Sequence, residues 1–527
     1  MQKIKNAPQF VTTQWCETFR FAAFFIFFFM SGLFFCPLVR ANNLAISNAS
    51  LTSQSTTNST VKVQFDISWS NSWRNNTNYD AAWVFVKYST DSGTTWNHAT
   101  LKTSGTNPSG FTGGSGTSLD VIVPTDKKGA FLQRSSNGYG TLTNTSAQLV
   151  WDYGTDGLTS STSAQIKVFG IEMVYVPTAS FYLGDGNASS ESTNALHVTD
   201  NTTFQVTTAS TASVTVDSNA NDDIDTTPIA IDGDGGITGN ASYPTGYTAF
   251  YLMKYEITEG GWVDFFNTLT AAQKATRDIT AASGKNSDSA VNRNTISWSS
   301  GDAATSRSDR AMNWISWMDG CAYADWAGLR PLTELEYEKA GRGANSAVYG
   351  EYAWGSTSLT AAATISGTED GTETISTSGA NANYNNTTFS GGDASGGPLR
   401  AGIFATSTSV RSQAGAGYYG NLGLSGNLNE LVVTLGNSTG RSFTGTNGDG
   451  ILTTTTSYEG NATNTDWPGI DGTASRGVTG ATGSGNRGGT YSDTTAGRLS
   501  ISDRNNSVTA ASSRLSAYGF RAVRTAP

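Results

Sequence analysis

The segment 486–524, close to the C-terminus, constrains the fold more than any other stretch. It begins with Arg487-Gly488-Gly489 and ends with Gly519-Phe520-Arg521. Glycine pairs permit tight backbone bends, and an aromatic residue after glycine can anchor a closing strand. Arg487, Arg504 and Arg521 offer forked hydrogen bonds that could fix the ends. Because the segment contains no Cys, His, Lys or Glu, it predicts a fixed frame that binds a ligand rather than transforming it.

The composition excludes some partners. The chain has 527 residues, enough for two or three domains, and a formal net charge of −10. Nucleic-acid binding favours a basic face, so nucleic acid is not an expected partner. Only 14% of the residues are charged and 59 are glycine, which is typical of a loop-rich, β-leaning extracellular protein.

Residues 1–41 read as a secretory signal peptide. Lys3, Lys5 and Arg20 precede a phenylalanine-rich apolar run, and residues 38–41 form a cleavage site. The alternative is an uncleaved membrane anchor, but Ser31, Gly32 and Pro37 interrupt the run. We therefore expect a secreted or cell-surface protein with no stable membrane span after cleavage. Cleavage would leave Cys321 as the single thiol, so no intramolecular disulfide is expected.

Residues 42–170 are expected to form an immunoglobulin-like β-sandwich. Polar residues alternate with apolar ones from Val61 to Trp69, which indicates a half-buried strand, and Ala82–Val86 is apolar on both faces. Residues 89–96 resemble an Asp-box hairpin, in which Asp91 caps its own turn and Trp96 closes the base. One copy is too few for a sialidase propeller, so a spacer or adhesion module is expected.

A second domain is expected over residues 171–527, with a polar insertion near 199–240. Alternating acidic and amide residues at 217–225 are reminiscent of a calcium loop, but Asp222 and Pro228 break the EF-hand pattern, which favours a solvated acidic loop. Three helices should follow, starting near Thr258, near Ser316 or Asp319, and at the capping box that begins with Thr333. Residues 355–420 and 436–485 read as long loops without a phosphate-binding motif.

Five stretches in this part of the chain together carry a family resemblance. They are Met173–Gly184, Tyr255–Thr258, Trp314–Gly343, Ser425–Glu430 and the frame of segment 486–524. In this order they resemble the formylglycine-generating enzyme (sulfatase-modifying factor) family. The resemblance implies an α+β, loop-rich fold similar to C-type lectins, whose last strands build the ligand groove.

The catalytic groups that the resemblance implies are missing. Formylglycine generation in that family uses a pair of cysteines in the C-terminal stretch to hold copper, and related iron enzymes use three histidines. This chain has no cysteine there and only His98 and His197. Serine or threonine cannot replace a copper-binding thiolate, so neither copper nor iron is expected. Cys321 is expected to be a packed thiol.

The resemblance also implies structural calcium at two places. One site would use the carbonyls of Gly426 and Leu428 with the carboxylate of Glu430, although Gly423 replaces the family's remaining side-chain ligand. The other would use Asn383 and the Tyr384 carbonyl, with Asp393 able to join. Oxygen ligands of this kind suit calcium, and a hydrogen-bonded turn is the alternative for each.

The family also includes the variable proteins of diversity-generating retroelements, in which adenines of a C-terminal repeat are randomised. Every residue from Tyr491 to Tyr518 belongs to the set that a mutated AAY codon can encode. The chain's general richness in Ser, Thr, Asn, Ala and Gly is the alternative explanation. The expected ligand contacts at exposed groove positions are Tyr491, Asp493, Asn505, Asn506, Ser513 and Tyr518.

Two classes of function follow. The first is a secreted or surface-exposed protein that uses the C-terminal groove to bind an unknown protein or glycan. The second is a divergent enzyme of the sulfatase-modifying factor family, and the missing cysteines count against it. A purely structural role in a cell-surface coat is a third alternative.

Overall fold

The computed structural model describes residues 44–185, 195–196, 203–209, 215–217, 224–225, 235–236 and 240–527. The predicted signal peptide and most of the polar insertion, including Asn219, Asn221 and Asp223 of the calcium-loop alternative, lie outside the described residues. The chain divides into two compact units, residues 1–172 and residues 173–526, with 263–270 and Pro527 grouped with the first. Within the described part, no helix has the length and apolarity needed to cross a membrane.

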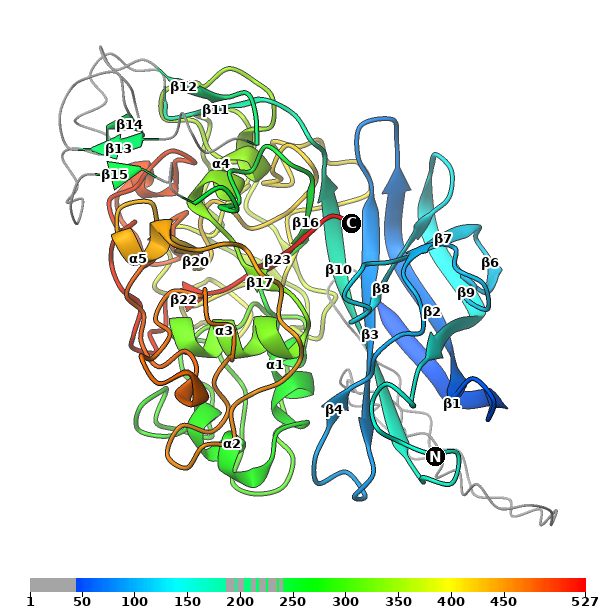
Figure 1. Cartoon of the computed structure of the whole chain (residues 1–527). Helices are drawn as coiled ribbons and strands as arrows, with labels where there is room; N and C mark the ends of the chain where they lie inside the picture. Colours follow the sequence, from blue (N-terminus) through cyan, green and yellow to red (C-terminus); the bar gives the residue numbers. More distant parts are fainter. Residues whose placement is uncertain are drawn as a thin grey trace, which may run out of the picture. The chain divides into compact units, whose positions relative to one another are not determined.

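The first unit contains two sheets that share one hydrophobic core (Figure 1). One sheet has the order β1-β2-β9-β6, formed by Ala45–Ser55, Thr60–Arg74, Gly138–Trp151 and Ser115–Gly116. The other contains β10-β3-β8-β7-β5, formed by Gln165–Val176, Asp80–Ser89, Ala130–Arg134, Leu119–Val123 and Gly105–Thr106. The short β4 (Asn97–His98) pairs with β3.

The strand patterns predicted from the sequence are confirmed in these sheets. In β2 the residues Val61, Val63, Phe65, Ile67 and Trp69 are buried and alternate with partly exposed neighbours. All ten residues of β3 are buried, as expected for a strand that is apolar on both faces. The immunoglobulin-like topology stays a prediction.

The Asp-box hairpin between β3 and β4 has the predicted hydrogen bonds. The carboxylate of Asp91 accepts from the backbone N–H of Thr95 at 2.9 Å, and the indole N–H of Trp96 donates to the Gly93 carbonyl at 3.1 Å. Gly93 has φ 90°, a conformation that glycine adopts without strain. This turn is therefore structural.

The second unit is loop-rich, with short helices and strands. Its helices are α1 (Glu259–Phe266), α2 (Ala271–Arg277), α3 (Trp317–Trp326), α4 (Glu334–Arg342) and α5 (Ser438–Arg441). Thr258, Ser316 and Thr333 accept backbone hydrogen bonds at the starts of α1, α3 and α4, as predicted. The helices α2 and α5 were not predicted.

Two groups of paired strands position the C-terminal segment. In the first, β17 (Arg330–Pro331) pairs with β23 (Ala522–Thr525), β23 pairs with β16 (Phe250–Met253), and β16 pairs with residues 173–176 of β10. In the second, β20 (Asn429–Val433) lies between β21 (Ser484–Arg487) and β22 (Tyr518–Gly519). Segment 486–524 therefore leaves one sheet at Arg487 and returns to it at Tyr518.

Candidate functional site

Buried ion pairs hold the ends of segment 486–524, as the sequence predicts. Glu334, the first residue of α4, accepts from Arg487 Nη1 at 2.8 Å and from Arg504 Nε at 2.6 Å. Arg487 also donates to Glu338 at 2.8 Å. These four side chains are buried. Burial alone would raise the pKa of Glu334, but Arg504 and Arg487 outweigh it and lower this pKa to about 2.

The closing arginine makes a similar set of contacts. Arg521 donates to the carboxylate of Glu430 at 2.6 Å and to the carbonyl of Leu422 at 2.7 Å, and its Nη2 lies 3.6 Å from Glu256. Two buried carboxylates therefore share one guanidinium. Burial, with the nearby Glu256, raises the pKa of Glu430 to about 7 although Arg521 opposes this shift.

The glycine at 488 allows the backbone to turn at the start of the segment. Gly488 has φ +88°, and a Cβ atom at this position would lie 2.5 Å from the carbonyl oxygen of Leu424. Any other residue would therefore meet both backbone strain and a steric clash. This explains why the frame begins with glycine after the arginine.

A pocket of about 350 Å³ opens between segment 486–524 and the loop after α4. Its volume lies in the range of small-ligand sites. The loop contributes Tyr349, Gly350 and Tyr352 to the pocket. Asp185, which follows the end of β11 (Phe181–Leu183), also lines it. The residues from the C-terminal segment are Thr495, Gly497, Arg498, Ser500, Asp503 and Asn505.

The pocket combines an exposed aromatic ring with charged groups. Tyr349 is 52% exposed. Arg498 lines the pocket, and its buried Nη1 atom has no hydrogen-bond partner within the described residues, so this guanidinium group keeps donor capacity for a ligand. Burial raises the pKa of Asp503 to about 6, although Arg498 opposes the shift. The pocket therefore offers a donor, a carboxyl group and a flat apolar surface.

The predicted ligand contacts are only partly brought together. Asn505 lines the pocket. Asp493 lies close enough to raise the pKa of Asp503, and its carboxylate accepts from the Thr490 backbone at 2.7 Å. The half-buried Asn506 accepts from Asn505 at 3.1 Å. Ser513 is exposed but does not line the pocket.

The expectation that Tyr491 and Tyr518 are exposed is corrected by the structure. Their exposed fractions are 4% and 9%, and Tyr491 packs against Ala311 and Leu428. Large aromatic rings gain more free energy from burial than small polar residues do. Sequence reasoning also missed Tyr349, Tyr352, Asp185, Arg498 and Asp503. For the last two, their charges within a stretch of mostly small polar residues were an available signal.

The residues predicted for the first calcium site have one feature that fits a cation. The Oε2 atom of Glu430 is buried and lacks a hydrogen-bond partner among the described residues. Gly423 supplies no side chain, but the carboxylate of Glu256 lies beside it, 2.6 Å from where a Cβ atom would be. Gly426 and Leu428 could add carbonyl oxygens. Carboxylate and carbonyl oxygen atoms suit a hard cation such as calcium. Calcium binding at this site stays a prediction.

The residues of the second predicted calcium site are engaged with protein groups. The Asn383 amide donates to the Gly397 carbonyl and to Asn427, both at 3.0 Å. The Tyr384 hydroxyl donates to the Thr494 carbonyl at 2.8 Å. Asp393 accepts a hydrogen bond from Arg293. In the parts of the chain that the structure describes, no group of three or more His, Cys, Asp or Glu side chains could hold a metal ion.

A comparison with known families matches residues 170–526 to the Sulfatase-modifying factor enzyme 1-like domain. The chain belongs to this family. No curated protein matches the chain. In this member of the family, the C-terminal segment 486–524 contains no cysteine. Cys321 is buried in α3, and burial raises the pKa of its thiol, which disfavours the reactive thiolate.

Proposed function

We propose that this member of the sulfatase-modifying factor family is a ligand-binding protein, secreted or displayed at the cell surface. The ligand would bind in the pocket formed by segment 486–524, on a C-type-lectin-like fold, while the N-terminal β-sandwich would act as a spacer. The observation that carries the proposal is the pocket itself. It combines an exposed tyrosine with an unpartnered arginine donor and lacks a cysteine.

The chemistry of the lining favours a hydroxyl-rich ligand such as a glycan. Tyrosine presents a flat apolar ring together with a polar tip, which gives contact area at low entropic cost. Arg498, Asp503 and Asn505 provide both donors and acceptors, the combination that hydroxyl groups use. A protein ligand that presents polar loops is the other outcome of the test.

The proposal is tested by screening the purified chain against an array of immobilised glycans. Tyr349→Ala and Arg498→Ala should each abolish the signals that the unaltered chain gives. Ser513→Ala is the matched control, because this exposed residue lies in the same segment but outside the pocket. Signals that survive both pocket substitutions would place the binding elsewhere.

A divergent enzyme is the second candidate, and one observation favours it. Asp503 has a pKa of about 6 beside a pocket, and a carboxyl group of this kind can exchange protons near neutral pH. Loss of a catalytic turnover on Asp503→Asn, with ligand affinity retained, would support this candidate over simple binding.

A further inference from the structure

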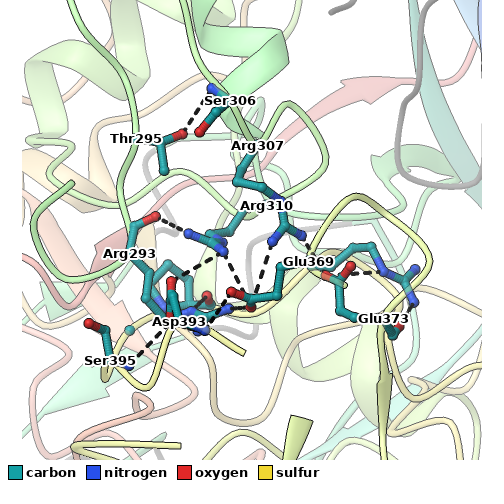
Figure 2. Close-up of polar contacts among 12 residues, drawn as sticks. Arg293, Thr295, Ser306, Arg307, Arg310, Glu369, Glu373, Asp393 and Ser395 are labelled. Carbon is teal, nitrogen blue, oxygen red and sulfur yellow. Dashed lines mark hydrogen bonds and ion pairs between the residues drawn. The ribbon is translucent and has the colours of Figure 1, made fainter. Parts of the chain in front are cut away.

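Three buried arginines converge on one carboxylate away from the pocket. Arg293, Arg307 and Arg310, here called the arginine cage, are at most 5% exposed. Figure 2 shows their guanidinium groups around Glu369. The Oε1 atom of Glu369 accepts a hydrogen bond from Arg293, and lies 3.4 Å from Arg310 Nη2 and 3.6 Å from Arg307 Nη1. Its Oε2 atom accepts from the backbone N–H of Asp393 at 2.9 Å.

A carboxylate does not satisfy this cage completely. One oxygen atom serves three guanidinium groups, and two of these contacts are longer than an ideal hydrogen bond. Arg310 Nε and Arg307 Nη1 are buried without a hydrogen-bond partner in the described part of the chain. Buried donors are normally satisfied, so the cage has more donors than Glu369 can use.

The backbone that carries the cage is strained. Asn292 and Arg293 have φ values of 46° and 66°, a left-handed conformation that non-glycine residues rarely adopt. Such strain persists only where the surrounding contacts hold it, and it is often found at binding sites. The strained turn places Arg293 with its side chain buried in the cage and paired with Glu369 and Asp393.

Glu369 reaches the cage from a small hairpin. The hairpin consists of β18 (Ile365–Ser366) and β19 (Thr374–Ile375), each only two residues long. Residues 366–368, 370 and 372 are exposed, whereas Glu369 and Glu373 point into the cluster. Two-residue strands contribute little pairing energy, so the tip is held mainly through its two carboxylates.

The charge count defines what could replace Glu369. The ion-paired cluster contains four arginines, the cage and Arg400, and four carboxylates, Asp309, Glu369, Glu373 and Asp393. Without Glu369 the cluster has a net charge of +1. A replacement should therefore carry one negative charge, and three terminal oxygens would match the three guanidinium groups.

We propose that the arginine cage is an oxyanion site for a sulfate monoester, and that Glu369 is its internal competitor. A sulfate monoester has a single negative charge and three terminal oxygens, and it stays ionised at physiological pH. On binding, it would displace Glu369 and release the hairpin tip. The ester group could belong to a sulfated glycan, whereas free inorganic sulfate, a dianion, would leave the cluster with an excess negative charge.

The test uses methyl sulfate as the probe and the full chain as the protein. Calorimetry should detect methyl sulfate binding to the unaltered chain, and hydrogen exchange of residues 366–373 should become faster in its presence. Glu369→Ala should bind methyl sulfate at least tenfold more tightly than the unaltered chain does, because the competitor is removed. The same variant should bind inorganic sulfate more weakly than methyl sulfate. Asp370→Ala, an exposed neighbour on the same tip, should behave like the unaltered chain.

Two results would overturn the proposal. If Glu369→Ala does not bind methyl sulfate, the cage is not an oxyanion site. If the unaltered chain shows neither binding nor faster exchange at concentrations that saturate Glu369→Ala, then Glu369 is a permanent structural partner of the cage. Adding Arg310→Met to Glu369→Ala should abolish binding, and retained binding would place the probe elsewhere.

Discussion

Glu334→Gln is expected to destabilise the C-terminal unit strongly. The substitution keeps the size of the side chain but removes the negative charge that Arg487 and Arg504 share. Arg487 keeps the charged partner Glu338, whereas the carboxylate that accepts from both Nε and Nη2 of Arg504 loses its charge. Breaking a buried ion pair from one side typically costs about 3–5 kcal/mol.

The pKa of Glu334 gives a similar magnitude. Its lowering from 4.5 to about 2 corresponds to about 3 kcal/mol of stabilisation of the charged form. Because the pKa is lower in the folded state, this contribution is fully present above about pH 4.5 and is lost as the pH falls towards 2. The unaltered chain should lose stability over this range, and Glu334→Gln should show a flatter dependence.

Urea denaturation, followed by tryptophan fluorescence at several pH values, measures both effects. Glu459→Gln makes the same chemical change at a partly exposed residue, and its cost should be within about 0.5 kcal/mol. If Glu334→Gln costs less than about 1 kcal/mol at neutral pH, or leaves the acid dependence unchanged, the arginines do not fix the frame as argued.

Three further predictions concern metal, catalysis and variation. If Glu430 helps to hold calcium, a chelator should lower the melting temperature, since calcium at about 100-fold excess over its Kd contributes about 2.7 kcal/mol to the stability of the folded state. Glu430→Ala should abolish that difference. Identical melting curves with and without chelator would mean that hydrogen bonds alone close the turn. Because the C-terminal segment lacks cysteine, incubation with copper and a Cys-x-Pro-x-Arg peptide should yield no aldehyde by mass spectrometry. An aldehyde product would favour the enzyme over the ligand-binding protein. If segment 491–518 is a retroelement target, deep sequencing of this gene in a population should find substitutions at adenine positions of one repeat. Uniform synonymous drift along the whole gene would contradict this hypothesis.

Local features of the fold could be predicted because their signals are local. The alternation from Val61 to Trp69 identifies a strand, and the Thr333 capping box identifies the start of α4. The short helices α2 and α5 have weaker signals, since α2 has no acidic residue in its first turn and α5, although capped by Asn437, has only four residues. Their formation depends on tertiary packing, which overrides weak propensity.

The candidate site could be predicted only in part. Arg487 and Arg521 were identified because they lie beside glycines at the two ends of one segment. The pocket, however, combines Asp185, Tyr349 and Asp503, which are far apart in the sequence, and no periodicity relates them. The burial of Tyr491 was missed because the small polar residues around it resemble a surface loop.

The most direct test of ligand binding at the pocket is a calorimetric titration with the glycan that gives the strongest array signal. A hydrogen bond from a charged donor contributes about 1.5–3 kcal/mol, so Arg498→Gln should weaken binding by roughly 10- to 150-fold. Ser513→Ala should bind as tightly as the unaltered chain. Equal affinities for all three proteins would contradict ligand binding in the pocket of segment 486–524.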